Sequence, residues 1–257
     1  MNHTIIGRSW LLLGLGLLLQ GCVTESTGPA RAADPQKQIA TLVELGTGYL
    51  RNGEYGRAKE HLLTALELDP RSPTAHNTLA LVFQLEQEYD VAEEHFKIAI
   101  RNKPDFTRAR NNYAAFLFDR GRFSDAIEQL QLAAEDRFYA GRPTVFENLG
   151  VAYLRTDDPV AAEQAFQRSI ALNPEQARAL VELANIRFEQ RRYVESRELY
   201  YRYEAISSQT ARGLWLCVRL ARVFDDSNRE ASCALALRNI FPTSAEYKQF
   251  EEMARER

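Results

Sequence analysis

Only a few residues of this chain have the side chains and spacing that catalysis or cofactor binding requires. Residues 46–48 read Gly-Thr-Gly, but they lie inside a predicted helix with no strand before it, so they do not form a dinucleotide loop. His61 and His95 lie 34 residues apart and could stack on adjacent helices. Two imidazoles without a third ligand do not make a zinc site, so we interpret both as surface histidines. We therefore expect no metal ion and no cofactor.

A pair of carboxylates, Asp157 and Asp158, comes directly before Pro159. This pattern is typical of a helix start, where a side chain accepts hydrogen bonds from free backbone N–H groups, rather than of an acid–base pair. The sequence also contains neither a Walker-type phosphate loop nor a Gly-x-Ser-x-Gly motif. We predict that the chain is not an enzyme. Its formal charge of −3 argues against nucleic acid as a partner.

The first 21 residues differ from the rest of the chain. Arg8 is followed by an apolar run of Trp, Leu and Gly from residue 10 to residue 19, and then by small and polar residues. This order is that of a secretory signal peptide. The run spans about ten residues, whereas a membrane-spanning helix needs roughly 20. We therefore assign residues 1–21 to a signal peptide.

The end of this segment, residues 19–22, reads Leu-Gln-Gly-Cys and resembles the bacterial lipobox. The resemblance implies a diacylglyceryl group on the sulfur of Cys22, cleavage before Cys22, and acylation of the new amino group. Two or three acyl chains form a stable anchor where one binds only marginally. In enteric-type bacteria an Asp directly after the modified Cys holds a lipoprotein at the inner membrane. This chain has Val23 there, so the resemblance implies the periplasmic face of the outer membrane. Residues 22–38 lack apolar periodicity, which predicts a lipidated Cys followed by a flexible tether.

Two further cysteines, Cys217 and Cys233, could form a disulfide in such an oxidising compartment. If the turn between the helices expected there centres near Asp225, the two side chains face each other. If it centres near Ser227, they miss by about one helical turn, which is too far for a disulfide. The sequence leaves both alternatives open.

From residue 39 the chain repeats with a period of 34 residues. The recurring positions are Ala58, Leu62, Ala65 and Pro70 in one segment and Ala92, Phe96, Ala99 and Pro104 in the next. This pattern resembles the tetratricopeptide repeat, a pair of helices termed A and B. Gly46 and Ala58 are small where the two helices must approach closely. Leu45, Tyr49 and Leu62 are expected to fill the space between them.

We expect six units and a tail. The units are 39–72, 73–106, 107–140, 143–176, 177–210 and 211–244, and in the tail Tyr247, Phe250 and Met253 predict a short closing helix. The sixth unit is degenerate, as expected of a terminal repeat, and has Leu214, Ala231, Leu235 and Pro242 at its repeat positions. The resemblance implies an all-α fold, a right-handed tetratricopeptide-repeat superhelix over residues 39–257.

In this repeat family the A helices line the concave face, so the resemblance implies a groove for a partner. The groove residues are Val43, Thr47, Leu50, Asn77, Leu81, Leu85, Asn111, Asn112, Phe118, Asn148, Val151 and Leu154. Apolar side chains can receive a partner segment and amides can pair with its backbone. Several of these side chains could instead pack between repeats; we favour Leu50, Leu81 and Leu85 as accessible. Val43 and Thr47 replace the Lys and Asn of chaperone-tail clamps, which argues against that ligand.

Signal peptide, lipobox, tether, repeats and a Tyr-x-x-Phe tail together resemble the type IV pilus biogenesis and stability lipoproteins of the PilF/PilW type. The stretches that carry the resemblance are LVELGTGYLRNGEYGRAKEHLLTALELDP, ARNNYAAFLFDRGRF, VFENLGVAYL and RLARVFDD. It implies an outer-membrane pilotin, delivered by the lipoprotein-sorting machinery and held in the membrane by its lipid alone. Such a protein binds a pilus secretin subunit and promotes its outer-membrane localisation and multimerisation, for pilus biogenesis and twitching motility. The alternative is a lipoprotein scaffold for another envelope assembly complex.

Overall fold

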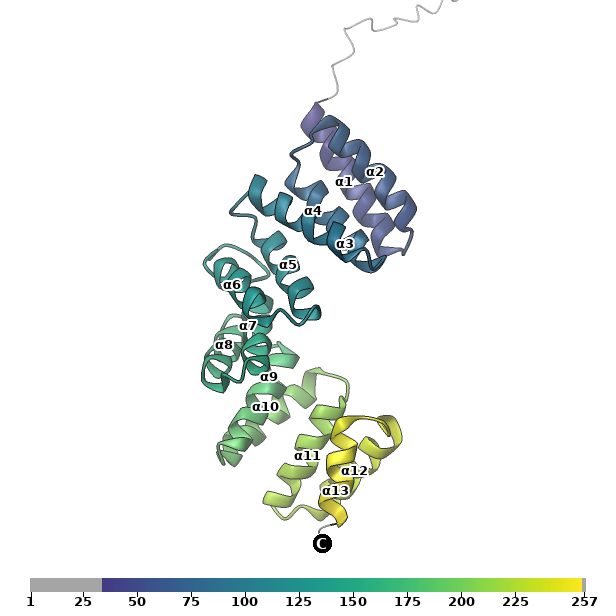
Figure 1. Ribbon diagram of the computed structural model, residues 1–257. Coiled ribbons are helices and arrows are strands. Elements are labelled where there is room, and N and C mark those ends of the chain that lie inside the picture. The colour runs from purple at the N-terminus through teal and green to yellow at the C-terminus, as the bar shows by residue number, and fades with distance from the viewer. Residues whose placement is uncertain (1–33, 256–257) are drawn as a thin grey trace, which may run out of the picture. The chain divides into compact units, whose positions relative to one another are not determined.

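The structure, a computed structural model, describes residues 34–255, and this part of the chain is all-α (Figure 1). The predicted signal peptide, Cys22 and most of the predicted tether lie outside the described residues. Within the described range, no helix combines the length and apolar character needed to span a bilayer.

Twelve of the thirteen helices in residues 34–255 form six A–B pairs. The A helices are α1 (Pro35–Arg51), α3 (Pro73–Leu85), α5 (Thr107–Asp119), α7 (Arg142–Arg155), α9 (Ala177–Glu189) and α11 (Ala211–Val223). The B helices are α2 (Tyr55–Leu68), α4 (Tyr89–Asn102), α6 (Phe123–Ala134), α8 (Pro159–Leu172), α10 (Tyr193–Ile206) and α12 (Ser227–Ile240). The last helix, α13 (Ala245–Arg255), is the predicted closing helix.

Helices contact only near neighbours in the chain. Each A helix packs against its own B helix and against the next A helix, and each B helix packs against the A helix that follows it (Figure 1). Such nearest-neighbour packing defines a solenoid, in which one continuous layer of A helices runs through the stack. The predicted all-α solenoid of tetratricopeptide repeats is confirmed.

In each of the six A–B turns, one residue adopts the left-handed backbone conformation. These residues are Gly53, Gln87, Gly121, Asp157, Arg191 and Asp225, with φ between 55° and 77°. Asp157 is therefore a turn residue, while the Oδ1 of Asp158 accepts a hydrogen bond of 2.9 Å from the N–H of Ala161 and caps α8. The acidic pair starts a helix, as its position before Pro159 predicts.

The close approach of A and B helices depends on small side chains. A Cβ atom on Gly46 would lie 2.6 Å from Cγ of Leu62, and one on Gly150 would lie 2.5 Å from the ring of Phe166. On the B helices the same repeat position holds Ala58, Ala92, Ala126, Ala162 and Ser196, and none of these side chains is exposed. The hydroxyl of Ser196 donates to the carbonyl of Ala184 at 2.7 Å, which satisfies its polar group inside the core.

At the N-terminal end the structure differs from two expectations. Helix α1 begins at Pro35, before the predicted domain boundary at residue 39, because proline is favoured in the first turn of a helix. Leu45 is 44% exposed and does not fill the space between α1 and α2. The equivalent Leu79 of the second unit is fully buried because a unit precedes it, and no unit packs on that side of α1 in the described part of the chain.

The register predicted for the sixth unit was also wrong in α12. Ala231 and Leu235 are exposed, whereas Cys233 and Leu237 are buried. Helix α13 packs against α11 and α12, with Tyr247, Phe250 and Met253 against the core, as predicted for the tail. Since α13 contacts α11 as each A helix contacts the next, it takes the place of a seventh A helix.

The turn between α11 and α12 centres on Asp225, which is the first of the two alternatives left open above. The Cα atoms of Cys217 and Cys233 lie 6.1 Å apart, and their sulfur atoms are joined in a disulfide. This bond ties the last A–B pair together, where the repeat consensus is weakest.

We predict that Gly150→Ala destabilises the protein. The added methyl group would collide with the buried ring of Phe166, and overpacking of this kind costs about 1–3 kcal/mol. Gly48→Ala is the matched control: its Cβ would meet no atom within 4 Å, so helix propensity should stabilise the fold by up to about 1 kcal/mol. Urea unfolding of both variants measures the two signs; equal shifts in the midpoint would contradict the packing argument.

The disulfide should be measurable by mass and by stability. The intact, non-reduced protein should be lighter by two hydrogen atoms than its reduced form. A bridge between residues 16 apart in sequence should stabilise the fold by about 3 kcal/mol. Reductant and the double variant Cys217→Ser, Cys233→Ser should therefore lower the urea midpoint equally. Two free thiols in the untreated protein, or no effect of reductant, would refute the bridge.

Candidate functional site

One face of the A-helix layer carries two cavities. The smaller, of about 200 Å³, is lined by residues of α5, α6, α7 and α9 and includes three of the predicted groove residues: Phe118, Asn148 and Val151. The larger, of about 500 Å³, is bounded by the end of α7, the start of α8, and α9, α11 and α13; we call it the C-terminal cavity. The predicted groove residue Leu154 lines it, and so does Asn185, at a concave position of the fifth unit.

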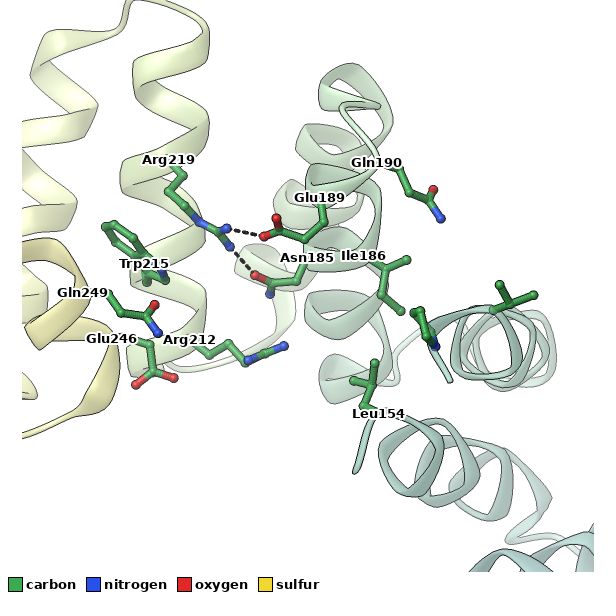
Figure 2. A pocket seen from close by; sticks show the side chains of 12 residues that line it. Leu154, Asn185, Ile186, Glu189, Gln190, Arg212, Trp215, Arg219, Glu246 and Gln249 are labelled. Atoms are coloured by element: carbon green, nitrogen blue, oxygen red, sulfur yellow. Dashed lines mark hydrogen bonds and ion pairs between the residues drawn. The ribbon is translucent and has the colours of Figure 1, made fainter. Parts of the chain in front are cut away.

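The C-terminal cavity has apolar walls and a charged rim. Leu154, Pro159, Val160 and Ile186 form one wall, and Trp215 lies on the other, as Figure 2 shows for Leu154, Ile186 and Trp215. Glu189, Arg212, Arg219, Glu246 and Gln249 supply the polar lining. A concave apolar site with a few polar groups is typical of a site that binds another molecule.

Sequence reasoning missed most of these residues, although the repeat itself locates them. Arg212, Trp215 and Arg219 lie 34 residues after Arg178, Val181 and Asn185, which occupy concave positions of the fifth unit. Glu246 and Gln249 lie a further 34 residues after Arg212 and Trp215. Extending the repeat positions through the degenerate sixth unit and into α13 would have identified the cavity.

Arg219 joins α11 to α9 at the centre of this cavity. Its guanidinium donates to Oδ1 of Asn185 at 2.6 Å and pairs with Glu189 (Figure 2). The same group lies 4.4 Å from the ring centroid of Phe188 and 5.4 Å from that of Trp215. Cation–π contacts and charged hydrogen bonds together hold this side chain in one place.

A second ion pair lies deeper in the same wall. Arg212 pairs with Glu182 at 2.7 Å, and the carboxylate of Glu182 is largely buried. Burial raises the pKa of the Glu182 carboxyl above its ordinary value, and the nearby charge of Glu246 adds to that effect. The positive charges of Arg212 and Arg178 oppose it. Arg212 is thus paired with a carboxylate of its own protein, although 46% of its side chain stays exposed.

The predicted amides join neighbouring A helices. Asn112 donates to Asn77 at 3.1 Å, and Asn148 donates to Asn111 at 3.2 Å. These bonds use one hydrogen-bonding group of each side chain, so the amides hold the stack together whether or not they also meet a partner. These four residues therefore contact one another between repeats, and their contact with a partner stays a prediction.

The remaining predicted groove residues differ in exposure. Leu85 is 54% exposed, as expected, whereas Leu50 and Leu81 are half-buried and pack against core clusters. Val43 and Thr47 are also half-buried, and the hydroxyl of Thr47 donates to the carbonyl of Val43. None of these five residues lines either of the two cavities.

The histidines are not the surface residues that the sequence predicted. His61 and His95 are half-buried and stack on Tyr49 and Phe83, each an aromatic residue of its own unit, rather than on each other. Nδ1 of His95 lies 2.9 Å from Nδ1 of buried His76. Burial is the main cause that lowers the pKa of His95, and the charge of His76 lowers it further. Within residues 34–255, no three His, Cys, Asp or Glu side chains come together as metal ligands would.

Comparison with known proteins identifies a family model and relatives that match this chain. The tetratricopeptide-repeat family model matches residues 43–86, 86–143 and 147–211. The type IV pilus assembly protein PilF of Pseudomonas aeruginosa is 37% identical over 246 residues, which cover 95% of this chain and 98% of that protein.

Two solved structures agree with the fold. The structure of Pseudomonas aeruginosa PilF superposes with a TM-score of 0.82 at 37% identity, covering 85% of this chain and 99% of that one. The crystal structure of PilW, a type IV pilus biogenesis factor, gives a TM-score of 0.69 at 24% identity and covers 82% and 97% of the two chains. The chain therefore belongs to the tetratricopeptide-repeat family and, within it, to the PilF family of type IV pilus assembly proteins.

Proposed function

We propose that this protein is an outer-membrane lipoprotein pilotin of the type IV pilus. It binds a subunit of the pilus secretin and promotes the localisation and multimerisation of the secretin in that membrane. The observation that carries the proposal is the similarity to PilF, which extends over nearly the whole length of both chains rather than over the repeats alone.

The groove supports a role in binding polypeptide. Apolar walls that face solvent along successive A helices can receive the side chains of an extended or helical segment. The arginines of the C-terminal cavity are held in ion pairs, which fix the shape of the surface that a partner would contact. In this proposal the protein makes and breaks no bond; it holds its partner and requires no cofactor beyond the lipid.

The predicted lipid on Cys22 accounts for delivery to the outer membrane. Cys22 lies in a lipobox-like segment, and Cys217 and Cys233 are joined to each other, so Cys22 is the cysteine left for acylation. A chain that binds a secretin subunit and is carried by the lipoprotein-sorting machinery would deliver that subunit to the outer membrane.

We predict that the double variant Val151→Lys, Leu154→Lys weakens secretin binding. Both side chains line cavities on the A-helix face, and placing charge at a buried apolar contact should reduce co-purification roughly tenfold or more. Leu235→Lys, on α12 and 50% exposed, is the control and should leave binding unchanged. Affinity purification from detergent extracts, with circular dichroism to verify folding, makes the comparison.

Secretin multimers and twitching motility in living cells test the role in assembly. Deleting the gene should reduce secretin multimers in the outer membrane and abolish twitching, and the groove variant should not restore either. Normal multimers without the protein would overturn the proposal, and co-purification of a different envelope complex would favour a scaffold role.

We predict that Cys22→Ala removes the protein from the outer-membrane fraction, because the anchor requires acyl chains on that residue. Density-gradient fractionation should find the variant outside the outer-membrane fraction, and purified variant should still bind the secretin because the groove is unchanged. A Cys22→Ala protein that stays in the outer-membrane fraction would show that something other than the lipid holds it there.

A further inference from the structure

The C-terminal cavity contains one charge that the protein leaves unpaired. Four charged side chains line it, and three of them form ion pairs: Arg219 with Glu189, and Arg212 with Glu182 behind the wall. Glu246 has neither an ion pair nor a hydrogen bond through its carboxylate in the described structure. Three charges are already neutralised, so the carboxylate of Glu246 is the group that remains available to a ligand.

Helix α13 presents this carboxylate to the cavity. Tyr247 and Phe250 lie on the side of α13 that packs against the core, while Glu246 and Gln249, three residues apart, line the cavity. The side-chain amide of Gln249 makes no hydrogen bond to any residue in the described range. A carboxylate and an amide one turn apart can meet a cationic side chain and a backbone peptide group of the same bound segment.

The apolar walls of the cavity indicate which side chain would lie next to the cationic one. Leu154 and Ile186 lie across the cavity from Trp215 and Glu246 (Figure 2). An aliphatic side chain placed between Ile186 and Trp215 would have a basic neighbour within reach of Glu246. A cavity of about 500 Å³ is large enough for a few residues of such a segment.

From this geometry we infer that the C-terminal cavity binds an extended polypeptide segment in which an aliphatic residue lies next to a lysine or arginine. An acidic segment fits less well, because the charges of Arg212 and Arg219 are already balanced by Glu182 and Glu189, and because it would face the unpaired carboxylate of Glu246. The inference rests on the proposed function in requiring a polypeptide partner, and it adds the site and the charge of the bound segment.

Tryptophan fluorescence tests it directly. The full chain has two tryptophans, and Trp10 lies in the predicted signal peptide, so the emission of the processed protein, or of an unprocessed Trp10→Phe chain, comes from Trp215 alone. Pools of capped hexapeptides, each with one position fixed, are screened by this signal. Pools fixed as Lys or Arg, and as Leu or Ile at the adjacent position, should give the largest saturable changes, and acidic pools should give none.

A matched pair of variants tests the role of the carboxylate. Glu246→Gln should weaken binding of the selected peptide roughly tenfold, since a charge-assisted hydrogen bond is lost. Glu252→Gln, on an exposed part of the same helix, should bind as the parent does. Glu246→Lys should shift the preference to acidic pools. Preference of the parent for acidic peptides, no pool that binds, or equal affinity of the Gln variants would overturn the inference.

Secretin co-purification separates this inference from the proposed function. Loss of secretin binding in Glu246→Lys, with Glu252→Lys unaffected, would support both. If Glu246→Lys still co-purifies the secretin while the Val151→Lys, Leu154→Lys variant does not, the pilotin proposal stands and the assignment of a basic segment to this cavity fails.

Discussion

The structure depends on one constraint: a single helix pair cannot bury both of its apolar sides, so each pair needs a neighbour. Leu45 and Leu79 show the size of this effect, because they occupy the same repeat position and are 44% and 0% exposed. The difference lies in what packs against them and not in their own sequence. Glycine or alanine at the A–B contact of the first five pairs permits the close spacing, and stacking of the pairs supplies the remaining burial.

The same constraint produces the groove and its closure. The A helices form a continuous layer that packs against B helices on one side, which leaves the other side free to hold cavities. At the C-terminal end the stack must stop, and α13 covers α11 with Tyr247, Phe250 and Met253. Since this helix follows the repeat register, its polar side falls at the cavity, and the cap of the fold is also a wall of the site.

Much of the fold was predictable from the sequence because its contacts are local. The 34-residue period predicted the helix pairs and the buried alanines, and the spacing of Tyr247, Phe250 and Met253 predicted the closing helix. Leu45 was placed in the core because a repeat pattern does not say which unit comes first. Ala231 and Leu235 were misplaced because the sixth unit departs from the consensus. There, α12 buries Cys233, which is bonded to Cys217, and Leu237 in place of Ala231 and Leu235.

The site was harder to predict than the fold. Repeat positions identify the concave face, but they do not reveal which side chains the protein itself uses. Asn77 and Asn112 bond to each other, whereas Glu246, in a tail that had been read only as a cap, keeps an unpaired charge beside Trp215. Ion pairs join side chains of two helices and the cavities are lined by side chains of several helices, and periodicity in one dimension does not contain that information.

The central claim is that the A-helix face binds another polypeptide, and crosslinking in living cells tests it most directly. A photoreactive amino acid is placed at Leu85 or Gln249 on the A-helix side, and at Leu63 or Leu235 on exposed parts of B helices. We predict secretin adducts from the A-helix positions and none from the B-helix positions. Adducts that form only from α2 and α12 would contradict the account.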